Sequence, residues 1–206
     1  MITRSRLFAL AVVSACTAAA SAQNIVKNGG FELSTVPNGT FITKSAGDLT
    51  LDNWVIGGDS IDHVGTYWAA YEGTQSIDLN GTKSYFNTAG SVAQTLATVV
   101  GQEYAVSWRM GGNPAGAPAT KSVEVFFGGV SQGVFTSPDT ISWNLKSFNV
   151  FATNSNSELK FVSLDPTPYG ALLDDVRGLV RGQAQRRRIA EADPVARGKG
   201  QGPHPI

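Results

Sequence analysis

Three aromatic side chains lie close together near the middle of the chain, and aromatic rings are surfaces on which the apolar faces of sugars stack. They are Tyr67, Trp68 and Tyr71. Successive side chains of a strand point to opposite faces, so a strand cannot bury all three rings on one face. We therefore expect at least one ring to be exposed. The hypothesis is a carbohydrate-binding surface made by these three rings, with Arg109 and Asn113 as polar partners for sugar hydroxyls.

The other tryptophans have a different expected role. Trp54, Trp108 and Trp143 lie in alternating, strand-like patterns. Large aromatic side chains bury extensive area and dominate the interiors of sandwich folds. We expect these three residues in the core.

Residues that could do catalysis are scarce. Outside the C-terminal tail the only histidine is His63, which lies in a strand pattern, and no serine lies in a G-x-S-x-G elbow. The sequence has no H-E-x-x-H motif and no phosphate-binding glycine loop. A glycosidase needs two facing carboxylates, and a chain with this many acidic residues brings some pair together by chance. The sequence predicts a binding protein and not an enzyme.

The formal net charge of zero averages unlike segments. Residues 23–176 hold seven Lys or Arg and fourteen Asp or Glu, a net charge of −7, whereas residues 177–206 hold six Arg and one Lys against two acids. Domains that bind nucleic acid are usually basic on one face. The acidic span therefore argues against a nucleic-acid partner.

The N-terminus predicts an export signal over residues 1–22. Two arginines precede an apolar run over 7–13, and Ala20-Ser21-Ala22 is a small-residue cleavage site. The run is shorter than the ~20 residues that span a bilayer. An alternative stays open, because Val13-Ser14-Ala15-Cys16 resembles a bacterial lipobox, in which the cysteine is lipidated. We expect a secreted or cell-envelope protein, attached to a membrane only if Cys16 carries lipid.

The single cysteine and the composition of the C-terminal tail give two further predictions. Cys16 is the only cysteine, so the folded part contains no intrachain disulfide. Residues 178–206 are basic and have no apolar face to bury, which predicts disorder. The Arg186–Arg188 run could contact an anionic polymer or membrane surface, the alternative being a solvated tail.

Short strands at roughly ten-residue spacing, without an amphipathic helix, predict an all-β antiparallel sandwich or barrel. The clearest alternation lies in 91–98 and 103–110. Asn80-Gly81 and Gly128-Gly129 predict tight turns, the former with positive φ at both residues. Residues 34–50 and 111–119 predict loops. The other expected strands are 24–27, 51–56, 61–64, 76–79, 123–127, 130–135, 145–152, 158–164 and 172–176.

Three segments carry a family resemblance: Asn28-Gly29-Gly30-Phe31-Glu32, the stretch from Tyr67 through Gly73 to Gly81, and Leu173-Asp174-Asp175-Val176. Together they resemble the bacterial choice-of-anchor C family over residues 24–177. These exported domains are related to a plant cell-wall family of unknown function and to carbohydrate-binding modules. The resemblance implies a galactose-binding-like jelly-roll β-sandwich over residues 23–177.

One departure from that family concerns the C-terminus. Its members usually continue into a sorting or anchoring signal, whereas the Arg-rich tail here has no hydrophobic helix and no LPxTG-like motif. The protein would then be secreted free or held by a lipidated Cys16, unless the tail is read in a shifted frame.

The resemblance to carbohydrate-binding modules also implies a structural calcium. By motif, Glu32 and Asp174 would be side-chain ligands, and Gly30, Glu72 and Gln75 would contribute carbonyl oxygens. Calcium takes six to eight oxygen ligands, which such a set can supply. Asp175 could take the place of Asp174. The alternative is that the two carboxylates cap strand ends in solvent.

The function expected from the sequence is an exported, non-catalytic module that binds cell-envelope or extracellular polysaccharide. The alternative is a structural or adhesive surface protein whose ligand is another protein.

Overall fold

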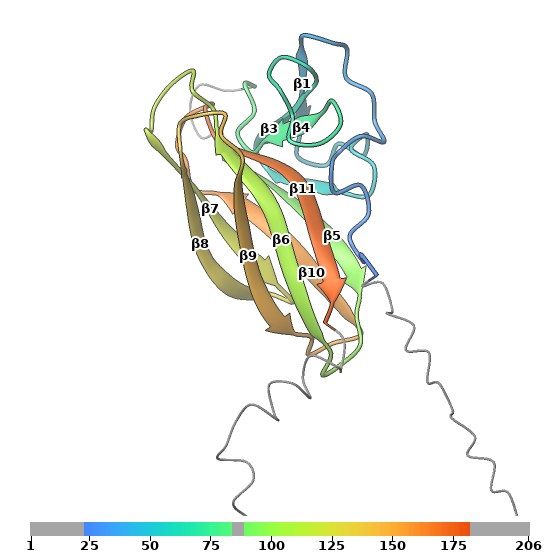
Figure 1. Ribbon diagram of the computed structural model, residues 1–206. Coiled ribbons are helices and arrows are strands. Elements are labelled where there is room, and N and C mark those ends of the chain that lie inside the picture. Colours follow the sequence, from blue (N-terminus) through green and yellow to red (C-terminus); the bar gives the residue numbers. More distant parts are fainter. Residues whose placement is uncertain (1–22, 84–88, 182–206) are drawn as a thin grey trace, which may run out of the picture.

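Strand β6 (Glu103–Gly112) shows how the alternating pattern builds the fold. Tyr104, Val106, Trp108 and Met110 are buried, while the residues between them face outward. A period of two places one side of a strand against the core and the other toward solvent. The same pattern in the neighbouring strands produces two antiparallel sheets with their apolar faces together (Figure 1).

The computed structural model describes residues 23–83 and 89–181. One sheet has six strands in the order β1 (Phe41–Ser45), β3 (Ser60–Val64), β4 (Ser76–Asp78), β11 (Ala171–Val180), β6 and β9 (Asn144–Phe151). The other has five strands in the order β2 (Val55–Gly58), β5 (Gly90–Ala97), β10 (Asn156–Ser163), β7 (Thr120–Phe127) and β8 (Val130–Pro138). The protein is thus an all-β sandwich, as predicted. The described part of the chain forms no helix that is long and apolar enough to cross a membrane.

The core lies between the sheets and is centred on Trp108. Its ring makes edge-on contacts with Phe135 at 4.7 Å and Phe161 at 5.2 Å between ring centroids. Trp54 is also buried and contacts Phe161. Both tryptophans therefore lie in the core as expected.

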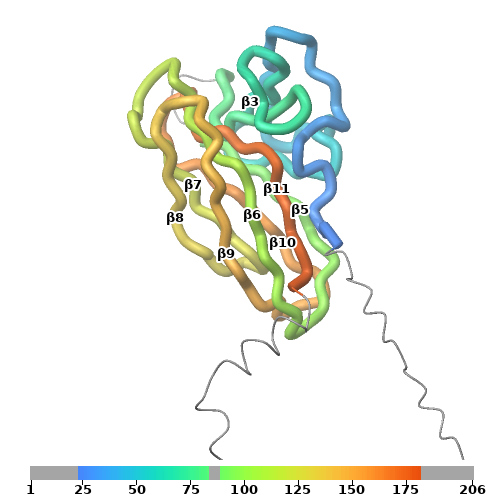
Figure 2. The backbone as a smooth tube through the Cα atoms, viewed as in Figure 1, coloured from blue at the N-terminus to red at the C-terminus, as the bar shows by residue number. Residues whose placement is uncertain are grey.

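The first and last described segments run side by side (Figure 2). Asn24 forms an isolated bridge with Leu179, and the amide of Ile25 donates to the carbonyl of Gly178 at 2.8 Å. This bridge replaces the full strand expected over 24–27. Strand β11 continues to Val180, beyond the boundary at 177 that the sequence predicted. The export signal with Cys16 and the tail beyond Arg181 lie outside the described residues.

Three further expectations need correction. Residues 34–50 are not all loop, because Phe41–Ser45 forms the edge strand β1. The strand expected over 51–56 starts at Val55, after a turn whose Asn53 has positive φ. Asn80-Gly81 is not a turn with positive φ. Gly81 is required there by close packing, since a Cβ would lie 2.4 Å from the Ser60 hydroxyl oxygen. The Gly128-Gly129 turn does have positive φ at both residues, 58° and 81°.

Candidate functional site

The loop over residues 65–75 joins β3 to β4 and is fixed by two carboxylates from distant parts of the chain. Asp174 Oδ2 accepts hydrogen bonds from the amides of Tyr71 at 2.7 Å and Glu72 at 3.0 Å. Glu32 Oε1 accepts from the amides of Thr74 at 2.8 Å and Gln75 at 2.7 Å. Hydrogen bonds to ionised acceptors are about twice as strong as neutral ones. We call Glu32, Asp174 and these four amides the carboxylate clamp.

Local irregularities bring both sides of the clamp into place. The register of β11 against β6 shifts between Asp174 and Arg177, and Asp175 has a φ of 49°. An extra residue in a strand turns the neighbouring side chains, so Asp174 faces the loop while Val176 remains in the core. On the loop side, Gly73 has a φ of 61°, and its Cα packs against Glu32. A side chain at that position would collide with the carboxylate.

The Asp174 carboxyl is fully buried. Burial raises the pKa of Asp174 to about 7, against the opposing effect of the amides that donate to it. Around it, Arg177 pairs with Asp175 at 2.5 Å and with Glu72 at 3.3 Å. Gln75 links the clamp to the N-terminal segment by accepting from the amide of Val36 at 2.7 Å and donating to the carbonyl of Phe31 at 3.1 Å.

The structure thus brings together the residues implied as calcium ligands, but in a different arrangement. Glu72 and Gln75 direct their N–H groups, and not carbonyl oxygens, at the two carboxylates. Gly30 lies against the side chain of Glu72. Among residues 23–83 and 89–181, no three His, Cys, Asp or Glu side chains gather in a way that could hold a metal ion. This conformation does not fit calcium, because the loop would first have to turn its carbonyls inward. Calcium stays a prediction.

Of the three predicted rings, Tyr67 and Tyr71 are exposed and Trp68 is half-buried, and the three do not form one compact cluster. Tyr67 is 58 % exposed, and its ring lies edge-on to Phe41 of β1 at 5.6 Å and to Trp68 at 5.4 Å. Trp68 is half-buried, and its indole N–H donates to the Ser76 hydroxyl of β4 at 3.0 Å. These three rings lie over the β1 side of the six-stranded sheet.

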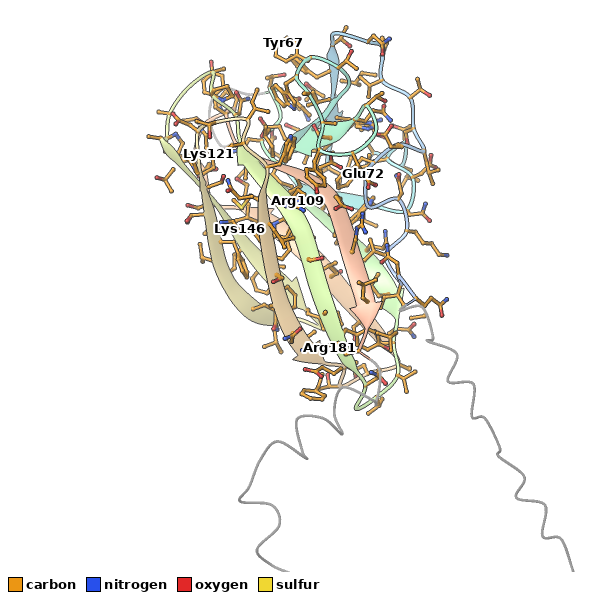
Figure 3. All side chains as sticks on the ribbon, in the orientation of Figure 1. Tyr67, Glu72, Arg109, Lys121, Lys146 and Arg181 are labelled. Carbon is orange, nitrogen blue, oxygen red and sulfur yellow. The ribbon has the colours of Figure 1, made fainter. Side chains whose placement is uncertain are left out.

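Tyr71 lies farther along the same sheet, over β6. It is 42 % exposed, and the guanidinium carbon of Arg109 lies 4.1 Å from its ring centre. Arg109 Nε is buried and has no hydrogen-bond partner in the described structure. Figure 3 shows Tyr67 at the tip of the molecule, with Glu72 and Arg109 below it. The cation–π contact holds Arg109 beside the ring.

Trp143 corrects one expectation and adds a fifth ring. It is not in the core but half-buried just before β9, where its indole N–H donates to the Ala69 carbonyl at 3.1 Å. We call Phe41, Tyr67, Trp68, Tyr71 and Trp143 the aromatic band. Sequence reasoning missed Phe41, although Phe41-Ile42-Thr43 is a run with high strand propensity. It misplaced Trp143 because a strand pattern does not show where the strand begins.

Asn113 does not join the candidate surface. Its side chain is buried. The side-chain Nδ2 donates to Asp78 Oδ2 at 2.8 Å, and the side-chain Oδ1 accepts from the Ala115 amide. Asp78 also accepts from the amides of Asn80 at 2.9 Å and Gly170 at 3.1 Å. Burial raises the pKa of Asp78 to about 8. Asn113 therefore holds a buried carboxyl and is not available to a ligand.

His63 lies on β3 and is buried, and its side chain makes one hydrogen bond. Its Nε2 donates to the carbonyl of Phe31 at 3.0 Å, and Nδ1 has no partner. Burial lowers the pKa of His63 to about 4. Because a ligand cannot reach it, His63 lacks the access that a general base needs.

Solved structures share this fold. A cyclase from Fischerella sp. superimposes with a TM-score of 0.53 at 15 % identity, covering 79 % of this chain and 98 % of the cyclase. TmCBM61, solved with β-1,4-galactotriose, superimposes with a TM-score of 0.51 at 15 % identity, covering 78 % of this chain and all of that module. At these identities the likeness shows the β-sandwich fold alone.

Sequence comparison gives the family. Halomucin from Haloquadratum walsbyi is 24 % identical over 160 residues, which cover 74 % of this chain and only 2 % of halomucin. The model of a family described as "Protein of unknown function (DUF642)" matches residues 24–179. The choice-of-anchor C name stays a prediction. With three quarters of its length matched, from the segment before the clamp to the last strand, the chain belongs to the DUF642 family.

Proposed function

We propose that this protein is a non-catalytic module that binds polysaccharide through the aromatic band. The observation that carries the proposal is the row of rings on and beside the clamped loop, with Tyr67 more than half exposed. Covering an exposed aromatic ring with a ligand removes apolar surface from water and so favours binding. Large amphipathic aromatic side chains are typical of binding surfaces. The solved TmCBM61, which has the same fold, holds a galactose oligosaccharide, and this supports a sugar as the ligand.

The proposed setting is the cell envelope or the extracellular space, reached through the export signal predicted over residues 1–22. The acidic charge of residues 23–176 favours a neutral polysaccharide over an acidic one, because like charges repel. A contribution from Arg109 is expected as a hydrogen-bond donor to sugar hydroxyls beside the Tyr71 ring.

A panel of immobilised polysaccharides tests the proposal, with β-1,4-galactan, β-1,3-galactan, xylan and cellulose as probes. We expect the full chain to be retained on at least one of them, and the Tyr67→Ala variant to bind about tenfold more weakly, a loss of about 1.4 kcal/mol. Phe151→Ala is the matched control, because Phe151 is 55 % exposed at the opposite end of β9.

Two results would contradict the proposal. One is a folded protein that none of the polysaccharides retains. The other is retention that Tyr67→Ala and Phe151→Ala weaken equally, since binding would then not depend on the band.

Melting temperatures test the calcium prediction. Calcium at a hundredfold excess over its Kd would raise the free energy of unfolding by about 2.7 kcal/mol, and EDTA would remove that gain. The carboxylate clamp, in contrast, needs no ion, because its acceptors are already used by amides. Equal melting temperatures in calcium and in EDTA would overturn the calcium prediction and leave the clamp to hold the loop without an ion. A higher melting temperature in calcium would show that the loop accommodates the ion.

A further inference from the structure

The aromatic band follows the strand order of the six-stranded sheet. Phe41 is on β1, Trp68 is tied to Ser76 of β4, Tyr71 is tied to Asp174 of β11, and Trp143 directly precedes β9. The contact between Tyr71 and Arg109 also brings β6 under the band. The strand register places these positions in one row, because Phe41 pairs with Val64, Val64 with Ser76, Asp174 with Arg109 and Arg109 with Leu145. The rings therefore lie in a row across the strands.

The row is long compared with one sugar. Neighbouring strands lie about 4.8 Å apart, so the five steps from β1 to β9 span about 24 Å. A monosaccharide or a chain terminus would cover only one or two of the rings. A ligand that contacts both Phe41 and Trp143 must be an extended chain of several sugars.

Three rings of the band are open to solvent, since Phe41 is 38 %, Tyr71 42 % and Tyr67 58 % exposed. A groove of about 890 Å³ lies elsewhere, lined among others by Asn24, Leu49, Trp54 and Gln94, and a hollow of about 300 Å³ surrounds Phe126 on the five-stranded sheet. Neither is lined by a ring of the band. A sugar terminus is best recognised in an enclosed pocket that surrounds it, whereas an open row of rings leaves both ends of a chain free to continue.

We propose that the ligand is a linear polysaccharide bound along its interior, running across the strands from β1 to β9, with several sugars in contact at once. This inference rests on the proposed function and specifies its ligand. Each ring contributes a weak contact, and a chain that reaches one ring is held close to the next, so the contacts reinforce one another. Affinity therefore grows with the number of sugars until the chain spans the band.

The test measures affinity by calorimetry for a ladder of oligosaccharides from dimer to hexamer, using β-1,4-galacto-oligosaccharides first and then those of any other polysaccharide retained in the panel. We expect the hexamer to bind at least tenfold more tightly than the dimer. Tyr67→Ala and Trp143→Phe, which lie toward opposite ends of the band, should each weaken hexamer binding, while dimer binding responds to at most one of them. Phe151→Ala should leave the whole ladder unchanged.

Equal affinity for dimer and hexamer, with only one of the two band variants affected, would overturn the inference while leaving polysaccharide binding intact. Because Trp143 also holds the loop through Ala69, circular dichroism and melting of Trp143→Phe must match the parent protein. If that variant melts earlier, Phe41→Ala and Tyr71→Ala are compared instead, and the same length dependence decides. Absence of binding at every length to every probe would overturn the proposed function itself.

Discussion

Replacing Asp174 by alanine is expected to lower the free energy of unfolding by about 3 kcal/mol, since three amides lose a buried acceptor at about 1 kcal/mol or more each. These are the amides of Tyr71, Glu72 and Asp175, which donate at 2.7, 3.0 and 2.6 Å. The loop would then lose one of the two carboxylates of the clamp. Urea denaturation followed by tryptophan fluorescence measures the change, and polysaccharide retention should fall with it.

Glu72→Ala is the control for this result. Glu72 lies in the same loop and carries the same charge, but it is 46 % exposed and pairs with Arg177, which is 49 % exposed. Exposed ion pairs contribute about 0–1 kcal/mol, so this variant should unfold almost as the parent does. Equal stability of Asp174→Ala and Glu72→Ala would refute the clamp.

Acidification is expected to lower the free energy of unfolding through the buried His63. The folded protein lowers the pKa of His63 from 6.5 to about 4, so between these values the unfolded chain binds a proton that the folded protein does not. The contribution is fully present above pH 6.5 and is lost as the pH falls toward 4, by about 3 kcal/mol in total. The physical reason is burial, which removes water from a charged imidazole, and a proton on Nδ1 would have no hydrogen-bond acceptor among the described residues.

Other groups titrate in the same range with the opposite sign. Burial raises the pKa values of Asp78, Asp165 and Asp174 to about 8, 6 and 7, so the folded state binds their protons more tightly and gains stability on acidification. Nearby Lys44 and Glu32 also act on His63, with opposite effects on its pKa. The measurement is therefore the difference between the parent and His63→Gln.

Glutamine is neutral at every pH and has a side-chain N–H that can donate to Phe31. The difference in unfolding free energy between parent and variant should shift in favour of His63→Gln by about 3 kcal/mol between about pH 7 and about pH 4. A difference that is constant with pH would show that the folded and unfolded states bind the His63 proton equally, and would refute the lowered pKa.

The strands and the core were predictable because they depend on local alternation. The pattern over residues 103–110 places Tyr104, Val106 and Trp108 on one face, and all three are buried. Edge strand β1 was not predictable in this way. Its Phe41 and Ile42 are both exposed, so the segment lacks the periodic burial that a strand pattern reports.

For the site, the sequence could indicate which residues meet but not which atoms face one another. Glu32, Asp174, Glu72 and Gln75 were grouped by resemblance, and the structure brings them together. Whether a loop directs N–H or C=O groups at a carboxylate depends on φ and ψ, here on the left-handed conformation of Gly73. Asn113 was misassigned for a similar reason, since nothing in its neighbourhood along the chain reveals the buried Asp78.

The clamp also determines when, during folding, the ring-bearing loop can become ordered. Tyr71 and Asp174 are separated by 103 residues and Glu32 and Gln75 by 43, and contacts between distant residues form slowly because a long stretch of chain must first close. Asp174 lies on β11, the last strand of the described residues, so a chain emerging from synthesis cannot fix the ring-bearing loop through Asp174 until β11 has been made. Chains truncated before β11 would therefore carry all five rings and still lack an ordered surface.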